Sequence, residues 1–278
     1  QQLSTRGAEL ELLDKQQTNQ RIGSSKFFGA LFNKSAGTIN PLSYCIGLAL
    51  AAQSKGANIY ETTLATKIQS INGHWLIKTT EGSIEAKMLL IATNAYQQPI
   101  KGIKSPEYTS VHYFQVATNP LPEKDTKMIL PNGEGCWDTA SVMSSFRLDE
   151  DNRLIIGGVG NLGHGASKIH TNWARRKIKS LFPNLKNIPI EYNWHGRIAM
   201  TANHIPKIQK LGNNAYSIFG FSGRGIGPGT YFGKAVVESL LSGDENSLPV
   251  TPMSQNKERY SGIKSKLFEL GATASHLL

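Results

Sequence analysis

The 278-residue sequence has only two cysteines, Cys45 and Cys136, and no apolar run that approaches the roughly 20 residues needed to cross a bilayer. Two cysteines exclude a disulfide framework, and the seven histidines form no HExxH-type cluster. We therefore expect no metal site, no membrane span and a cytoplasmic location. Cys45 falls on the apolar side of a predicted helix, which favours a buried core thiol over a redox cysteine.

Acidic residues are also in deficit, with 20 Asp and Glu against 30 Lys and Arg, so the net charge is +10. The basic residues are spread along the chain except in the cluster Arg175–Lys179, on a predicted helix. No aromatic residues interleave with this cluster, which favours a solvated helix face over a nucleic-acid site. A nucleic-acid-binding protein would show steeply salt-dependent binding. We expect instead that the excess charge attracts an anionic cofactor or substrate.

A helix is predicted from Pro41 onward, with Asn40 as its N-cap and Lys55-Gly56 at its end. A short strand over residues 57–61 is expected to follow, which would make half of a βαβ unit whose first strand lies upstream. The buried side of the helix is predicted to consist of Leu42, Cys45, Ile46, Ala49 and Leu50, which recur at helical spacing.

Residues 66–71 and 75–80 are predicted strands of a hairpin, because Asn72-Gly73 between them is a strong two-residue turn signal. The continuous apolar run Met88–Ala92 indicates a parallel strand buried on both faces. It ends in the small and polar residues 93–96, where such a strand presents its C-terminal end to a ligand.

Residues 99–195 differ from the preceding segment in their pattern of predicted elements. Strands over 111–118, 153–158 and 190–194 are separated by turn residues, and a helix is predicted over 172–182. This pattern predicts a mainly antiparallel sheet inserted into an α/β framework. The framework returns at Tyr216 with a strand, a glycine loop and a helix that Gly243 ends. The polar tail from Ser247 is expected to pack loosely.

The glycine loop runs Gly220-x-x-Gly223-x-Gly225 and leads into a helix. Glycines at such a turn let the main chain approach a flat or anionic group and leave helix N–H donors facing it. The spacing differs from both the phosphate-binding loop and the dinucleotide fingerprint. A tight turn that allows close helix packing is the alternative interpretation.

The segment Trp194–Pro206 places Arg197 among apolar neighbours, so we expect a buried guanidinium that needs a partner. A substrate carboxylate or a cofactor oxygen would bind the guanidinium fork in two places. An internal salt bridge is the alternative. His195 would point to the opposite face of a strand and is predicted to be structural. The sequence Gly220-Phe221-Ser222-Gly223 lacks the flanking pattern of a hydrolase nucleophile elbow.

Three stretches of the sequence resemble the D-amino-acid-oxidase-like superfamily of FAD-dependent amine oxidoreductases, and most closely its bacterial gamma-glutamylputrescine oxidoreductase group. They are Gly37–Leu42 with Gly47–Ala49, then Ile91–Tyr96, and the pair Trp194–Pro206 and Gly220–Gly233, which is the most specific. The resemblance extends from about residue 23 to residue 243.

The resemblance implies an α/β fold, α+β overall, in which a partial FAD-binding Rossmann-like domain carries an inserted, mainly antiparallel substrate domain. Residues 1–97 would be the middle part of the FAD-binding domain and residues 98–195 the substrate domain. Residues 196–246 would complete the FAD-binding domain, and residues 247–278 would form the tail.

The resemblance also implies a flavoprotein activity with FAD as cofactor. In this family a C–N bond of an amine or amino acid is oxidised by hydride transfer to flavin N5, and water hydrolyses the resulting imine. A small-molecule amine, such as a gamma-glutamylputrescine-like substrate of polyamine catabolism, would be the partner. A catalytically inactive remnant or non-enzymatic subunit that keeps the scaffold is the alternative.

Individual residues take their expected roles from matching positions in the family. Arg197 matches an arginine that holds a substrate carboxylate, and aromatic walls are expected from Tyr113, Trp194 and Tyr231. Ala65 should lie near the adenine side, and Thr93 and Asn94 near the pyrophosphate. The loop expected against the flavin ring contributes Gly223, Arg224, Gly225, Ile226, Gly227 and Thr230.

The sequence departs from the family pattern at its start. No Gly-x-Gly-x-x-Gly fingerprint follows a strand near the N-terminus, and the chain opens at Gln1. We therefore expect a C-terminal portion of a longer protein, or one partner of a split enzyme whose ADP-binding unit comes from elsewhere. Alone, such a chain should bind FAD weakly. The sequence has Asn203 where many family members have Asp, and Val159 where they have a polar residue. These two differences leave the identity of the substrate undetermined.

Overall fold

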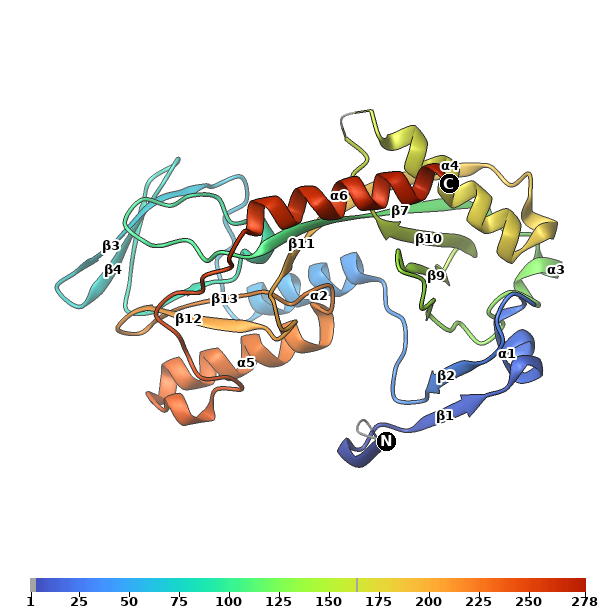
Figure 1. Cartoon of the computed structure of the whole chain (residues 1–278). Helices are drawn as coiled ribbons and strands as arrows, with labels where there is room; N and C mark the ends of the chain where they lie inside the picture. The colour runs from blue at the N-terminus through green and yellow to red at the C-terminus, as the bar shows by residue number, and fades with distance from the viewer. Residues whose placement is uncertain (1–3, 164) are drawn as a thin grey trace. The chain divides into compact units, whose positions relative to one another are not determined.

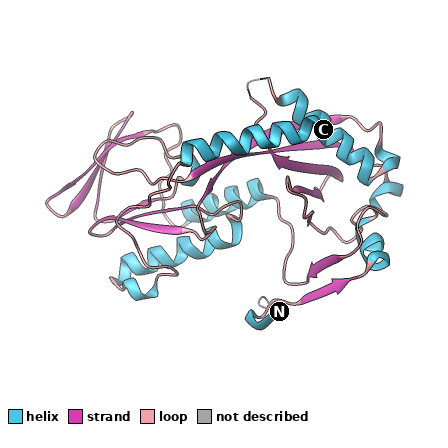
Figure 2. Cartoon of the chain, in the orientation of Figure 1, coloured by secondary structure: helices cyan, strands magenta, loops and turns pink. Residues whose placement is uncertain are grey.

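The computed structural model describes residues 4–163 and 165–278; residues 1–3 and 164 lie outside the described residues. Helices and strands are mixed throughout (Figures 1 and 2). The chain divides into two compact units. Unit 1 comprises Gln1–Tyr44, His112–Gly196 and Phe268–Leu278, and unit 2 comprises Cys45–Val111 and Arg197–Leu267. The predicted domain boundaries are a different division, and they stay a prediction.

The main sheet of unit 1 has the strand order β11-β7-β10-β9-β8. The pairs β10–β7, β10–β9 and β8–β9 are antiparallel, which confirms the predicted antiparallel sheet. Alternate apolar residues of the central strands pack on helix α4 (Ser167–Leu181), as a half-buried sheet requires. The strands are β7 (Thr109–Pro120), β8 (Cys136–Trp137), β9 (Ser144–Leu148), β10 (Arg153–Val159) and β11 (Ile190–Met200).

The N-terminal part of unit 1 is an antiparallel pair, β1 (Leu10–Leu13) and β2 (Ala30–Asn33), joined through helix α1 (Lys15–Ile22). Asp14 and Gln17 form a capping box at the start of α1, with Gln17 N–H donating to Asp14 Oδ1 at 2.8 Å. We expected a parallel strand upstream of the helix that begins at Pro41. The two described strands before that helix pair with each other in antiparallel fashion, so this expectation is wrong for the described residues. A short helix, α3 (Glu123–Thr126), follows β7.

Unit 2 is built on the three-stranded sheet β12-β13-β6, in which β13 (Ala215–Phe219) runs parallel to β6 (Leu89–Ile91) and antiparallel to β12 (Lys207–Gly212). Tyr216 and Ile218 pack against helix α5 (Ile226–Ser242), while Ala215 joins a cluster with Trp75 of the neighbouring hairpin. The parallel strand predicted over 88–92 is confirmed. Ile91 is the one buried residue of β6, because this edge strand pairs with β13 alone among the described residues.

The predicted hairpin is also confirmed, as β3 (Ala65–Ile71) and β4 (His74–Thr79), which continue into β5 (Ser83–Ala86). Asn72 and Gly73 both have positive φ, 49° and 82°, as the predicted turn requires. Trp75 at the start of β4 is buried and donates its indole N–H to the Asn213 carbonyl at 2.9 Å. The hairpin is thereby fastened to the loop before β13.

Helix α2 (Pro41–Ser54) begins at the predicted N-cap, where Ser43 N–H donates to Asn40 Oδ1 at 3.1 Å. None of its residues is buried: Leu42 is 67% exposed, Leu50 is 60% exposed, and Cys45 is exposed. The expected buried stripe and buried thiol are therefore wrong. The expected strand over 57–61 is also wrong, since those residues form no ladder. A strand requires a hydrogen-bonding neighbour, and none is found in the described chain.

The C-terminal tail is not loosely packed, because residues Ser261–Leu277 form helix α6 (Figure 1). Ser110 N–H donates to Ser265 Oγ at 2.9 Å, and Ala272 and His276 are buried. The polarity of the tail sequence does not predict loose packing here, because the residues that anchor α6 are themselves small or polar.

Candidate active site

The glycine turn follows a strand whose five residues are all buried, and it leads directly into α5. Gly220 and Gly223 have positive φ of 80° and 83°, which explains glycine at both positions. Gly220 N–H donates to Asn94 Oδ1 at 3.0 Å, and Ser222 N–H donates to the Ala199 carbonyl at 3.1 Å. The turn is therefore held between the end of β6 and the end of β11.

The glycines of this turn differ in what packing demands of them. A Cβ at Gly220 would lie 2.4 Å from Thr201 Cγ2, so the fold itself requires glycine there. A Cβ at Gly223 or Gly225 would make only ordinary contacts, at 3.5 Å or more, and one at Gly227 would meet nothing within 4 Å. The side of α5 where these residues lie is therefore open. A flat ring that approaches the main chain fits this opening, and protein packing does not explain it.

The end of β6 supplies the second element of the site. Thr93 and Asn94 follow the strand directly, and Asn94 has a positive φ of 45°. Thr93 is exposed, while the Asn94 side chain accepts the Gly220 N–H. The structure thus places Asn94 at the glycine turn, on the C-terminal side of a parallel strand pair, where open α/β sheets bind ligands.

Arg197 lies on β11 and is exposed, so the expectation that its guanidinium is buried is wrong. β11 is the edge strand of its sheet, which leaves side chains near its end open to solvent. The guanidinium carbon lies 4.7 Å from the centre of the Tyr96 ring, and Arg197 N–H donates to Tyr96 Oη at 2.9 Å. No carboxylate among residues 4–163 and 165–278 forms an ion pair with it. The internal salt bridge is thereby disfavoured.

Sequence reasoning missed Tyr96 as the residue that holds Arg197. Its only signal was its place at the polar end of the β6 segment. Burial raises the pKa of the nearby Tyr108 phenol, and the positive charge of Arg197 opposes that rise. The cationic side chain therefore has aromatic neighbours and remains available to an anion.

The three predicted aromatic walls belong to different units. Tyr231 is an exposed residue of α5 in unit 2. Tyr113 and Trp194 belong to unit 1; the Tyr113 hydroxyl hydrogen-bonds Ser145 Oγ at 2.8 Å, and burial raises its pKa. Trp194 is exposed on β11. Their convergence on one substrate stays a prediction.

The remaining predicted cofactor residues all belong to unit 2. Ile226 opens α5 and is exposed, and Thr230 Oγ1 donates to the Ile226 carbonyl at 2.9 Å. Arg224 makes a long contact, 3.4 Å, from its guanidinium to the His204 carbonyl. Ala65 begins β3, opposite Thr79 of the hairpin, and has no hydrogen bond to the glycine turn.

His195 and the basic cluster Arg175–Lys179 both lie in unit 1, and their contacts are with neighbouring residues of that unit. His195 is exposed and lies edge-on to the His112 ring, with 6.0 Å between ring centres. In the basic cluster of α4, Lys177 pairs with Asp138 at 2.7 Å and Ile178 is buried. In the part of the chain that the structure describes, no group of three metal-type ligands is found. No described helix has the length and apolar character of a membrane span.

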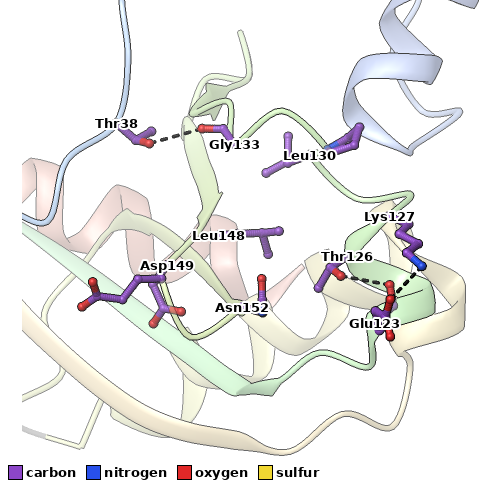
Figure 3. Close-up of a pocket in the computed structure, with 11 residues that line it drawn as sticks. Thr38, Glu123, Thr126, Lys127, Leu130, Gly133, Leu148, Asp149 and Asn152 are labelled. Atoms are coloured by element: carbon purple, nitrogen blue, oxygen red, sulfur yellow. Dashed lines mark hydrogen bonds and ion pairs between the residues drawn. The ribbon is translucent and has the colours of Figure 1, made fainter.

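A cavity of about 610 Å³ in unit 1 is lined by none of the predicted site residues (Figure 3). Its charged side chains already have partners: Glu123 pairs with Lys127 at 2.7 Å, and Asp149 Oδ1 accepts the Arg153 N–H at 2.8 Å. Thr38 donates its hydroxyl to the Gly133 carbonyl at 3.2 Å. We assign the cavity no role in binding.

A buried parallel strand, an open glycine turn and a helix beginning at that turn define the cofactor-facing part of a Rossmann-like nucleotide-binding domain. The family model described as FAD dependent oxidoreductase (DAO) matches residues 1–239. The chain therefore belongs to this family, whose cofactor is FAD, and the fold class predicted from sequence is confirmed.

Individual relatives agree with this assignment. The chain is 31% identical over 241 residues to the probable oxidoreductase OrdL of Haemophilus influenzae, covering 85% of this chain and 55% of the relative. It is 30% identical over 241 residues to the gamma-glutamylputrescine oxidoreductase of Escherichia coli, with the same coverages. The resemblance drawn from the motifs is confirmed. The chain spans about half the length of these relatives.

Among solved structures, L-proline dehydrogenase from P. horikoshii superimposes with a TM-score of 0.76 at 22% identity. The match covers 89% of this chain and 68% of that structure. At this level of identity the similarity establishes the fold.

Proposed function

We propose that this chain is the substrate-side portion of an FAD-dependent enzyme that oxidises a C–N bond in an amine or amino acid. The observation that carries the proposal is the open glycine turn, where positions 225 and 227 have room for side chains yet carry none. When bound, FAD supplies the hydride acceptor. Gly223–Gly227 and the first N–H groups of α5 would lie along its ring, because glycine permits close approach and the helix start favours electron-rich oxygens.

Arg197 would orient the substrate. Its backbone N–H is bonded to Tyr96 Oη, and its guanidinium lies over the Tyr96 ring with no ion-pair partner among the described residues. The guanidinium can therefore bind a carboxylate through two parallel hydrogen bonds. A gamma-glutamylated amine carries a carboxylate at its glutamyl end and an oxidisable amine at the other. We propose this substrate class, and hence a role in cytoplasmic polyamine catabolism. Tyr113, Trp194 and Tyr231 would form the apolar walls.

We further propose that an ADP-binding unit, from a preceding segment or a separate chain, completes the cofactor site. Two features of the described residues support this. Helix α2 exposes its apolar residues, including Leu42, Ile46 and Leu50. The edge of β6 away from β13 has no neighbouring strand. Parallel sheets are normally covered on both faces, so a further strand beside β6 and a layer over the apolar side of α2 would account for both features.

The test is an anaerobic titration of the purified chain with FAD, followed by addition of gamma-glutamylputrescine. We expect weak FAD binding, and loss of the yellow flavin absorbance on adding the amine once FAD is in excess. Arg197→Lys keeps the charge but loses the fork, and should require at least about tenfold more substrate for the same bleaching rate. Tight stoichiometric FAD binding by the chain alone would overturn the proposed second unit.

The alternative is an inactive scaffold subunit that keeps the fold. The open glycine turn and the available Arg197 favour the enzyme. Flavin that binds but is never reduced by gamma-glutamylputrescine, putrescine or amino acids, even with a complementary ADP-binding unit present, would establish the scaffold role and end the catalytic proposal.

A further inference from the structure

Helix α6 is amphipathic in the reverse of the usual sense. The residues on its anchored side, Ser265, Glu269, Ala272 and His276, are small or polar and recur at helical spacing. Each polar one has a partner within its own unit: Ser265 Oγ accepts from Ser110 N–H, Glu269 Oε1 accepts from Asn161 N–H at 3.0 Å, and the His276 ring meets that of His170. Helices of globular proteins normally turn their apolar side inward.

The opposite side of α6 is apolar and exposed. Leu267 and Leu270 are 62% and 67% exposed. Apolar residues that cluster on an exposed surface indicate an interaction site. Five of the exposed apolar positions are separated by four, three, four and three residues, which is the spacing of a coiled-coil seam, and Phe268, also exposed, lies outside this row. The seam consists of Ile263, Leu267, Leu270, Ala274 and Leu277.

We propose that two copies of the chain associate through this seam, with their α6 helices antiparallel. In that arrangement Leu267 of one copy packs against Leu270 of the other, and Ile263 packs against Ala274, so that a large side chain meets a small one. A parallel pair would place Ala274 of one copy against Ala274 of the other. Two small side chains would leave a void there, and packed interfaces disfavour voids.

Charge distinguishes the same two arrangements. Lys266 flanks the seam near its N-terminal end, as does Lys264, which pairs with Glu258 of its own chain at 2.6 Å, while Gly271 and Thr273 flank the seam near the other end. A parallel pair would bring Lys266 of one copy beside the lysines of the other, whereas the antiparallel pair places it beside a neutral residue of the other copy. The helix dipoles also favour the antiparallel pair.

The size of the seam sets the expected strength. With on the order of 100 Å² exposed on each large side chain, covering the seam and its flanking residues on two copies buries about 1,000 Å², the lower limit for a specific interface. We therefore expect a concentration-dependent dimer of modest affinity. The anchors at Ser265, Glu269 and His276 hold the helix in place beforehand, so little ordering is needed on association.

Sedimentation velocity of the full chain over a range of concentrations tests the proposal. We expect monomer and dimer in exchange, and Leu270→Lys or Leu267→Asn should shift the population to monomer by at least about tenfold in dissociation constant. Leu12→Lys alters a more exposed leucine on β1, 82% exposed, and should leave the dimer unchanged. Circular dichroism verifies that each variant is folded. A monomer at all concentrations, or a dimer indifferent to both seam variants, overturns the proposal.

Cysteine cross-linking tests the orientation. In a Cys45→Ser background, the double variant Ile263→Cys/Ala274→Cys should form a disulfide-linked dimer and neither single variant should. Burial raises the pKa of the remaining Cys136 to about 12, which keeps it unreactive. Efficient cross-linking of the single variant Leu270→Cys would indicate a parallel pair and overturn the antiparallel arrangement. Binding of α6 to anionic lipid vesicles by a monomeric chain would overturn self-association as well.

Discussion

Replacing Gly227 with alanine tests whether this glycine is required for cofactor binding or for the stability of the fold. Gly227 is the second residue of α5, and a Cβ there would meet no protein atom within 4 Å. Alanine is favoured over glycine in a helix by about 0.5–1 kcal/mol. In the apoprotein, Gly227→Ala should therefore leave the free energy of unfolding unchanged or raise it by up to about 1 kcal/mol, worth roughly 2–4 °C in Tm.

The same methyl group should weaken FAD binding. If the ring lies against the main chain at Gly225–Gly227, the added carbon occupies space that the ring needs. Inserting a methyl group into a close-packed contact costs about 1–3 kcal/mol. At about 1.4 kcal/mol per factor of ten, the FAD dissociation constant should rise between about fivefold and 150-fold.

Gly220→Ala is the matched control. Its Cβ would lie 2.4 Å from Thr201 Cγ2, at a φ of 80°. We expect it to lower the free energy of unfolding by about 2 kcal/mol or more, because left-handed backbone strain and overpacking add. Urea denaturation and flavin-fluorescence titration measure the two quantities for each variant. A Gly227→Ala protein that binds FAD as the wild type does would refute the assignment of this turn to the cofactor.

Three further predictions concern the supports of the site and the buried histidines. Asn94→Ala removes the acceptor of the Gly220 N–H and should lower the free energy of unfolding in urea by about 1–2 kcal/mol, while Asn94→Asp keeps an acceptor and should cost less. Arg197→Ala should raise KM at least about tenfold for amines that carry a carboxylate and leave it nearly unchanged for amines without one, and equal effects on both would contradict its role. Burial first, and then the charges of His170 and Arg176, lower the pKa of His276 from 6.5 to about 4. A neutral histidine with a depressed pKa stabilises the fold above pH 6.5, and that contribution is lost as the pH falls toward 4. Stability measured by tryptophan fluorescence should therefore decline over this range, and a His276→Phe variant that declines equally would exclude His276 as the cause.

Local sequence patterns predicted the elements that are defined by their own residues. The Asn72-Gly73 turn fixed the hairpin, because only a few residue types accept positive φ at both positions. The Asn40-Pro41 start fixed the beginning of α2. The alternating strands of the antiparallel sheet were likewise readable, since one face of each packs on a helix.

Burial could not be predicted in the same way. The stripe containing Leu42 and Cys45 shows which side of α2 is apolar, but only a neighbouring element can cover it. Arg197 has apolar neighbours in sequence, yet it lies on an edge strand and is exposed. Helix α6 escaped prediction because its inward positions, such as Glu269 and His276, are polar.

The candidate site was partly predictable. The spacing of the glycines indicated a main chain open to a ligand, and family resemblance indicated which ligand. The sequence could not distinguish Gly220, which packing requires, from Gly227, which it does not. Nor could it show that Tyr96 anchors Arg197, because the two residues are 101 positions apart in the chain.

Hydrogen–deuterium exchange of the amides in residues 221–230, with and without saturating FAD, distinguishes a glycine turn that binds the cofactor from one that does not. We expect FAD to slow exchange in this segment, because the ring covers the turn and the start of α5, while exchange in α4 stays unchanged. Unchanged exchange in residues 221–230 at FAD concentrations that saturate the chain would contradict this expectation.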